Sequence, residues 1–226
     1  LTGNWRDEHL FVLKQALAMY DDIARHLAEC DAKLQALLGE LGQRKVDLGK
    51  APRAGSSSRA EFDARQTLAN WAGVDLTRIN GLGLAAVLKI LSELGPDLSH
   101  FATVKHFCSW LGLAPKHEIS GAKVLKNRTL KTKNRAGQAF RMAAQSVKKS
   151  DTVFGSIYRR MRTRLDKAQA TVAVAHAIAR VVYRMLKYKV EYEQVGIEEY
   201  EKKYEEQQIK YMKKKAAKFG FQLIPA

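Results

Sequence analysis

A serine followed by closely spaced cations is the arrangement in this sequence that could do covalent chemistry. Ser120 and Gly121 precede a stretch of basic residues, of which we single out Lys123, Arg128, Lys131 and Arg135. A serine hydroxyl attacks phosphorus slowly unless cations neutralise the phosphate and a group accepts the hydroxyl proton. These cations would meet the first requirement, so Ser120 is a candidate nucleophile toward a phosphodiester. The alternative is that Ser120 makes a hydrogen bond in a turn beside lysines that only bind nucleic acid.

A glycine turn is a second candidate for phosphate binding. The residues Ile79-Asn80-Gly81-Leu82-Gly83 stand between a short helix and a longer one, as in the helix-hairpin-helix element of DNA-handling proteins. Glycines allow a close backbone approach, and the N–H groups that open the second helix could then hold a phosphate. An ordinary glycine turn is the alternative. We reject the dinucleotide fingerprint Gly81-x-Gly83-x-x-Ala86, because no strand precedes it and no acidic residue follows about 20 positions later in a βα pattern.

The positive charge of the chain is concentrated in one segment. The 226 residues carry a formal net charge of +16, while residues 99–190 hold 20 Lys and Arg against three acidic residues, a net charge of +17. A solvated face usually mixes both signs, and attraction to an acidic membrane is the other alternative. We predict that this segment binds nucleic acid, because many cations on one segment neutralise phosphates and release their counterions.

The sequence excludes several other classes of protein. Cys30 and Cys108 stand alone, without a C-x-x-C pair or a Cys/His cluster, so we expect no disulfide framework and no metal site in this chain. No apolar run approaches the roughly 20 residues that span a bilayer, and no signal-peptide pattern is present. We therefore expect a cytoplasmic protein that does not enter a membrane. Because the chain begins at Leu1 rather than at a methionine, we also expect it to be a fragment of something longer.

No strand-like alternation of apolar residues persists along the chain, so the fold is predicted to be all-α. Helices must therefore position the candidate residues. A helix that Asn4 caps, from Trp5 to about Leu41, has apolar residues at the spacing of a heptad seam, which Asp31 interrupts. This pattern predicts either a coiled coil that joins protomers or a long helix packed within its own chain. Residues 116–133 are predicted to form a loop or a short hairpin. Further helices are predicted at about 60–72, 103–111, 134–149, 151–165, 168–189 and 197–219, besides the two that flank the glycine turn.

Three domains follow from these elements. Residues 1–58 are predicted to be a coiled-coil helix with a flexible linker at 51–58, because that stretch is rich in turn residues. Residues 59–98 hold a helix and the helix-hairpin-helix element. Residues 99–226 form a basic helical domain that contains the serine loop.

Six motifs of the sequence resemble one family in their expected order. They are Leu1-Thr-Gly-Asn-Trp-Arg6, Ile79-Asn-Gly-Leu-Gly83, Phe107-Cys-Ser-Trp-Leu-Gly-Leu-Ala-Pro115, Ile119-Ser-Gly-Ala-Lys-Val-Leu125, Lys133-Asn-Arg135 and Gly220-Phe-Gln-Leu-Ile-Pro225. Together they resemble the insertion-sequence transposases of the IS-one-ten type, the bridge-RNA-guided recombinases, over essentially the whole chain. The resemblance implies that Ser120 attacks a DNA phosphodiester and forms a transient phosphoserine link. It also implies DNA and a guide RNA as partners, and a homo-oligomer assembled through the coiled coil.

The resemblance does not extend to the metal site of the family. In that family an N-terminal RuvC-like domain carries acidic metal ligands, and nothing in this chain matches that domain. Asp21, Asp22 and Asp31 belong to the seam helix and are not substitutes. A divalent metal is therefore expected in the missing domain, and this chain is expected to hold no cofactor. The rival hypothesis is a catalytically inactive nucleic-acid-binding module, in which the cations, Gly81 and Gly83 bind phosphates and Ser120 has no covalent role.

Overall fold

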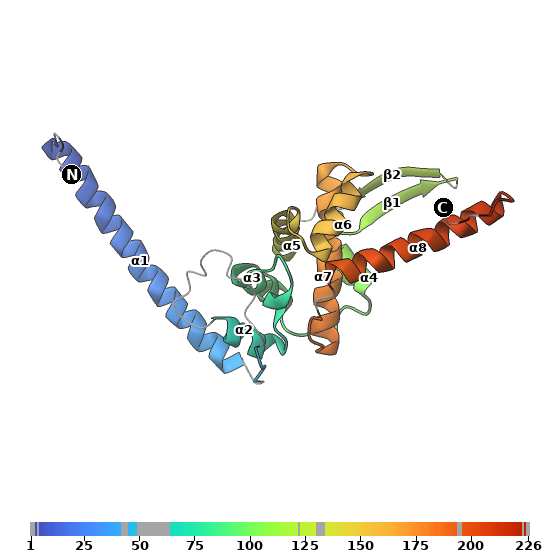
Figure 1. The fold of residues 1–226 in the computed structure, drawn as a ribbon. Coiled ribbons are helices and arrows are strands. Elements are labelled where there is room, and N and C mark those ends of the chain that lie inside the picture. The colour runs from blue at the N-terminus through green and yellow to red at the C-terminus, as the bar shows by residue number, and fades with distance from the viewer. Residues whose placement is uncertain are drawn as a thin grey trace.

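The computed structural model describes residues 3, 5–41, 45–48, 64–121, 123–129, 134–193, 196–222 and 224, with the backbone alone at 116–119 and 123–128. Within these residues the chain forms eight α-helices, one 3-10 helix and one antiparallel hairpin (Figure 1). The elements are α1 (Asp7–Leu41), α2 (Ala64–Ala72), η1 (Leu76–Arg78), α3 (Leu84–Leu94), α4 (Val104–Trp110), β1 (Pro115–Ser120), β2 (Lys123–Thr129), α5 (Arg135–Val147), α6 (Val153–Arg162), α7 (Lys167–Tyr188) and α8 (Ile197–Lys218).

The predicted helical fold is confirmed. Each predicted helix is found with bounds that differ by a few residues, and of the two alternatives left open for 116–133 the described strands favour the hairpin. The Asn4 cap, the linker at 51–58 and Lys131 lie outside the described residues. Among those that are described, no helix is both long and apolar enough to cross a membrane.

Helix α7 lies at the centre of the helical body, where it packs against α4, α5 and α6. Its inward-facing side chains, including Val174, Ile178 and Val182, are completely buried. The Asp166 side chain starts the helix by accepting the N–H of Gln169 at 2.7 Å, which satisfies one of the donors that a helix start leaves free. The apolar face of this helix is therefore the centre of the core.

One hydrophobic core joins the helices from Leu38, near the end of α1, to Leu186 in α7. Phe107 of α4 is fully buried and lies 5.2 Å from Phe101, 5.5 Å from Tyr183 and 6.4 Å from Phe140 between ring centroids. Phe107 packs edge-to-face with Phe101 and with Phe140, and such pairs stabilise a core beyond the contribution of the apolar area that they bury. The core thereby fixes α4 and α5, the two helices between which the hairpin is inserted.

Two helices extend away from this body (Figure 1). Helix α1 packs against α2 near its C-terminal end, and Leu38 is its one buried residue. Helix α8 has no buried residue and packs against α6. Both helices therefore leave long surfaces without a partner in the described chain.

Candidate nucleic-acid interface

Ser120 lies at the tip of the β1–β2 hairpin. It is the last residue of β1 and pairs with Lys123, the first residue of β2, so the connecting loop has two residues. Two-residue hairpin loops favour turn types in which the first of the two residues has a positive φ. Gly121 is that residue, and its φ is +55°. The glycine thus allows the tight reversal that leaves the Ser120 side chain exposed at the tip.

The register of the hairpin brings most of its charged positions onto the face that carries Ser120. Ser120 pairs with Lys123, Glu118 with Lys126, and Lys116 with Arg128, and alternate residues of a strand share a face. The regular pairing is interrupted by a bulge between Glu118 and Ile119. The polar residues His117 and Asn127 lie between these positions, and the bulge interrupts the pattern, so the segment shows no sustained apolar alternation.

The predicted cations divide between the tip and the base of the hairpin. Lys123 lies directly opposite Ser120 in the backbone, whereas Arg128 is five residues further along β2, roughly 17 Å away at the usual rise of a strand. Arg135 follows the hairpin as the first residue of α5, and its Nη1 lies 3.8 Å from Glu93 Oε1 of α3. Its side chain is 80% exposed. The structure therefore places Lys123 near the serine and Arg135 at the base.

Two residues that sequence reasoning missed hold the base of the hairpin in place. The Asn134 side chain accepts the N–H of Gly137 at 2.9 Å, which caps α5, and its Nδ2 donates to the Trp110 carbonyl at 3.5 Å. Arg141 donates from Nη2 to the Gly112 carbonyl at 2.9 Å. An Asn just before a helix is a recognisable capping signal, but the bonds to α4 and its following turn depend on the fold.

No described side chain lies in position to activate Ser120. Its hydroxyl makes no hydrogen bond with any side chain that the structure describes, and the hairpin strands pack mainly on each other. A serine needs an adjacent proton acceptor to become a strong nucleophile. The described part of this chain therefore presents the serine without completing a catalytic site around it.

A buried carboxylate holds the short helix that leads into the glycine turn. Asp75 is 2% exposed, accepts the N–H of Thr77 at 3.0 Å and pairs with Arg65 Nη2 of α2 at 2.6 Å. This contact fixes the 3-10 helix η1 and hence the path into residues 79–83. Helix α3 then begins after Gly83, whose position as N-cap brings no side-chain hydrogen bond.

Gly81 and Gly83 have different surroundings. Gly81 has a φ of +93°, and a Cβ built on it would lie 2.5 Å from Val147 Cγ1 and 2.8 Å from the Ala143 carbonyl oxygen of α5. At Gly83 a Cβ would meet no atom within 4 Å. The described contacts therefore give Gly81 a packing role, whereas Gly83 is exposed and a side chain added there would meet open space.

The remaining exposed cations lie on the helical body. In the basic segment, further exposed Lys and Arg side chains occur on or beside α4–α7, namely at Lys105, Lys149, Arg159, Arg162, Arg164, Lys167, Arg180, Arg184 and Lys189. Their charge is positive with few acidic neighbours, as expected for a surface that binds phosphates.

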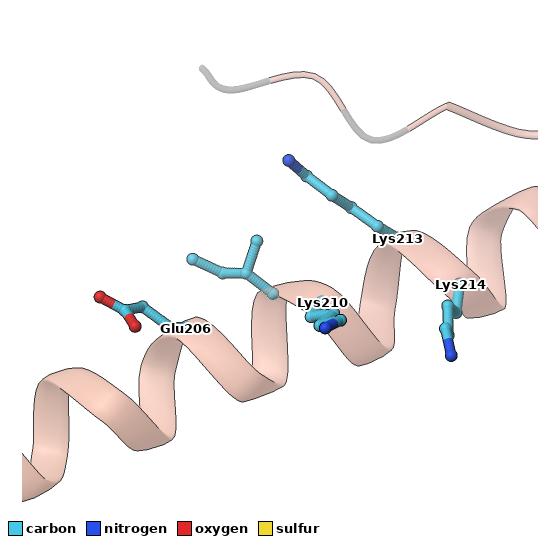
Figure 2. Close-up of a pocket in the computed structure, with 5 residues that line it drawn as sticks. Glu206, Lys210, Lys213 and Lys214 are labelled. Atoms are coloured by element: carbon cyan, nitrogen blue, oxygen red, sulfur yellow. The ribbon is translucent and has the colours of Figure 1, made fainter.

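The described residues offer little for a small ligand or a metal. One open groove runs along α8, lined by Glu206, Ile209, Lys210, Lys213 and Lys214. Figure 2 shows Lys213 and Lys214 pointing to opposite sides of the helix. No three His, Cys, Asp or Glu side chains gather into a metal-binding group within the searched part of the chain.

A comparison with protein families gives one match. Residues 75–159, less than half of the chain, match the family described as Transposase IS116/IS110/IS902. The matched segment begins at the carboxylate of the glycine turn and includes α3, α4, the hairpin with Ser120 and α5. No curated protein matches the chain. The family match supports a transposase of the IS110 type, and with it a role in which the chain interacts with DNA.

Proposed function

We propose that this chain is the DNA-binding part of a transposase that cuts and rejoins DNA through a covalent link between Ser120 and a phosphate. The observation that carries the proposal is the position of Ser120, exposed at the tip of a hairpin, paired with Lys123, inside the segment that matches the transposase family. A nucleophile at a projecting tip can reach a phosphodiester of duplex DNA without a pocket.

The proposed reaction is a transesterification at phosphorus. The Ser120 Oγ–H loses its proton to an acceptor, Oγ forms a bond to phosphorus, and the bond from phosphorus to one deoxyribose oxygen breaks. That oxygen leaves with the electron pair and takes up a proton. In the reverse step a sugar hydroxyl of the other DNA end attacks the phosphoserine and releases Ser120. The number of phosphate ester bonds is unchanged, so no nucleotide cofactor is consumed.

Several residues of the chain would hold the nucleic acid during this reaction. Lys123 would neutralise the attacked phosphate, and Arg128, Lys131 and Arg135 would bind phosphates along the strand toward the base of the hairpin. The amides at Gly83 would bind a further backbone phosphate. We propose a guide RNA as a second ligand of the same basic surface, and an assembly of copies through α1.

The proposal requires a proton acceptor from outside the described chain. The Ser120 hydroxyl has no partner among the described side chains, and we propose that a second domain or copy supplies the acceptor. By resemblance this would be a RuvC-like domain with a divalent metal. The same observation favours the second candidate function, a nucleic-acid-binding module without catalysis.

A trapping experiment distinguishes the two functions. DNA with sulfur in place of the bridging oxygen at the scissile phosphate releases a thiolate that needs no acid to protonate it and attacks the phosphoserine poorly. The adduct should therefore accumulate when the protein is assayed together with a RuvC-like domain that supplies the proton acceptor. We expect the protein to form a covalent adduct with this DNA, and peptide mass spectrometry to place the nucleotide on Ser120. Ser120→Ala should abolish the adduct and retain DNA binding.

The exposed serine of α4 provides the matched control. Ser109→Ala should form the adduct as the wild type does, because Ser109 lies on α4 and not in the hairpin. An adduct on another side chain would exclude the serine mechanism. DNA binding without an adduct, also when a RuvC-like domain is added, would favour the inactive module.

A further inference from the structure

The C-terminal end of α4 leaves three successive carbonyl groups without a partner in its own helix. Gly112 has a φ of +64°, its N–H donates to the Ser109 carbonyl at 2.9 Å, and the N–H of Leu113 donates to the Cys108 carbonyl at 2.9 Å. This is the usual pattern of a helix that ends at a glycine. It satisfies the carbonyls of residues 108 and 109, so the carbonyls of residues 110–112 need partners from elsewhere.

Two side chains of α5 donate to these carbonyls. Asn134 Nδ2 donates to the Trp110 carbonyl at 3.5 Å, and Arg141 Nη2 donates to the Gly112 carbonyl at 2.9 Å. The Arg141 side chain is half-buried and has no ion-pair partner among the described residues. Its guanidinium is therefore used on a neutral backbone group at the point where the chain leaves α4 for the hairpin.

The third carbonyl, that of Leu111, lies against a glycine of α5. A Cβ built on Gly137 would lie 2.3 Å from the Leu111 carbonyl oxygen, so a larger residue would push the two elements apart. Asn134, Gly137 and Arg141 are three and four positions apart and therefore share one face of the helix. We call these three residues the carbonyl clamp, because their face of α5 holds the end of α4.

The hairpin is attached to the helical body at the carbonyl clamp. Strand β1 begins at Pro115, three residues after Gly112, and β2 ends at Thr129, five residues before Asn134. Within the described residues the two strands pack mainly on each other, and the hairpin projects from the body (Figure 1). Its direction therefore depends on how its two ends are held at the base.

The length of the hairpin amplifies any change of angle at its base. Five residue steps separate Pro115 from Ser120, so a change of about 10° at the base would move the serine by about 3 Å at the usual rise of a strand. A displacement of about 1 Å at a reacting group can already lower a rate by about a hundredfold. Small changes in the contact between α4 and α5 would thus be large at Ser120.

We propose that Arg141 and Asn134 are positioning residues, which fix the direction of the hairpin and thereby place Ser120 against DNA bound on the body. The chemical consequence rests on the proposed function, whereas the fixed direction does not. The packing of the core does not require this arginine, because α4 and α5 both pack against α7 through apolar side chains. A half-buried cation is a costly way to fill space, and its hydrogen bond to the hairpin base accounts for its presence.

Substitution of Arg141 separates positioning from binding. In the trapping assay with a RuvC-like domain, Arg141→Ala should slow formation of the Ser120 adduct at saturating DNA by at least about tenfold. The DNA concentration that gives half of the maximal rate should stay within about twofold, because a misplaced nucleophile lowers the rate without changing binding. Arg141→Lys should recover most of the rate, since an ammonium can also donate to the Gly112 carbonyl.

The other results would overturn the role of Arg141. A wild-type rate in Arg141→Ala, or an equal loss in Arg141→Lys, would show that the bond to Gly112 does not position the serine. Weaker DNA binding at an unchanged maximal rate would assign Arg141 to phosphate binding instead. Gln138→Ala is the matched control, because Gln138 is exposed on α5 outside the carbonyl clamp, and it should react as the wild type does.

Asn134→Asp tests the clamp without removing the cap of α5. An aspartate accepts the N–H of Gly137 as the asparagine does, but its carboxylate cannot donate to the Trp110 carbonyl. We expect an unchanged urea midpoint and a lower rate of adduct formation at saturating DNA. An unchanged rate would remove Asn134 from the proposal.

A distance measurement tests the direction of the hairpin without any chemistry at Ser120. Nitroxide labels are attached to Ser120→Cys at the tip and to Lys167→Cys at the start of α7, in a chain that also carries Cys30→Ser; Cys108 is buried and is not labelled. Pulsed electron double resonance should give one narrow distance distribution. Addition of Arg141→Ala should broaden or shift this distribution, and Arg141→Lys should restore it.

The two readouts fail independently. A distribution that Arg141→Ala leaves unchanged would overturn this inference, even if the wild type forms the Ser120 adduct. A distribution that depends on Arg141, in a chain that forms no adduct with a RuvC-like domain present, would support the fixed direction and overturn only the catalytic part of the proposed function.

Discussion

Gly81 and Gly83 stand two residues apart in one turn, and their surroundings predict opposite effects of substitution. Gly81→Ala forces a side chain into a positive φ and against the Ala143 carbonyl and Val147 of α5. The two effects together should lower the free energy of unfolding by about 2–4 kcal/mol in urea titrations. Gly81→Val is for the same reason unsuitable as a test of phosphate binding, because the larger side chain would press further against α5.

Gly83→Ser is the better probe of phosphate binding at this turn. A serine meets no neighbouring atom there and is a preferred N-cap, so the free energy of unfolding should stay within about 0.5 kcal/mol of the wild type. Its hydroxyl would occupy the amides that open α3 and compete with a phosphate. We expect weaker DNA binding in a fluorescence anisotropy titration. Unchanged binding would show that residues 79–83 have only a structural role and bind no phosphate.

His176 makes the stability of the fold depend on pH. Burial, and then the positive charge of Arg180, lower the pKa of His176 below the ordinary value of 6.5. As the pH falls through 6.5, the unfolded chain takes up a proton that the folded chain does not bind, so the free energy of unfolding decreases. His176→Asn should reduce this decrease between pH 7 and 5 in urea titrations. His106→Asn, at an exposed site on α4, is the control and should show the wild-type slope.

Helix α8 is attached by a small polar contact with α6. Arg160 donates to the Tyr200 hydroxyl at 2.5 Å, and its guanidinium lies 3.7 Å from the ring centroid of Tyr204. Ser156 also donates to Glu201 at 3.0 Å. Because α8 buries no residue of its own, these contacts are its main attachment.

Arg160→Ala should therefore release α8 without unfolding the core. We expect faster amide hydrogen exchange throughout α8, while α5 and α7 retain their protection, because those helices are held by the apolar core. Arg160→Lys should give the same result, since an ammonium does not reproduce the planar stacking of a guanidinium. Arg164→Ala, at an exposed site beyond α6, should leave the exchange of α8 unchanged.

The elements differ in how far the sequence specifies them. Helices with a sustained apolar period, such as α1 and α7, were predicted to within two residues at each end, because the period and the capping residues are local. The hairpin was one of two alternatives, since its paired positions are charged on one face and it has little apolar alternation. The coverage of Leu38 by α2 could not be predicted, because the two elements are joined by a segment whose path the sequence does not define.

The candidate site was predictable in its residues but not in its geometry. Ser120 and its cations stand out by type and spacing, whereas the separation of Lys123 at the tip from Arg135 at the base depends on the register of the strands. Likewise, the packing of Gly81 on α5 joins residues more than 60 positions apart. Contacts of this kind depend on tertiary packing, which no local pattern encodes.

At the scale of the whole molecule, the charge separates the chain into two surfaces. Helix α1 carries seven acidic and three basic residues, whereas residues 99–190 carry the net charge of +17. DNA should therefore bind the hairpin and the body formed by α4–α7, and α1 should be left free to pair with a second copy. This separation predicts that substitutions on the two surfaces affect different measurements.

The salt dependence of DNA binding tests the separation. Each phosphate that a cation neutralises releases counterions, so the logarithm of the affinity should fall linearly with the logarithm of the salt concentration, with a slope of about −0.9 per contact. Arg135→Gln should weaken binding and make the slope less steep by about one contact, since Arg135 is exposed at the base of the hairpin. Lys33→Gln removes the same charge from an exposed position on the outer face of α1 and should change neither the affinity nor the slope. If both variants changed the slope equally, the binding would follow the net charge of the chain rather than the basic segment, and the placement of DNA on the hairpin and α4–α7 would be wrong.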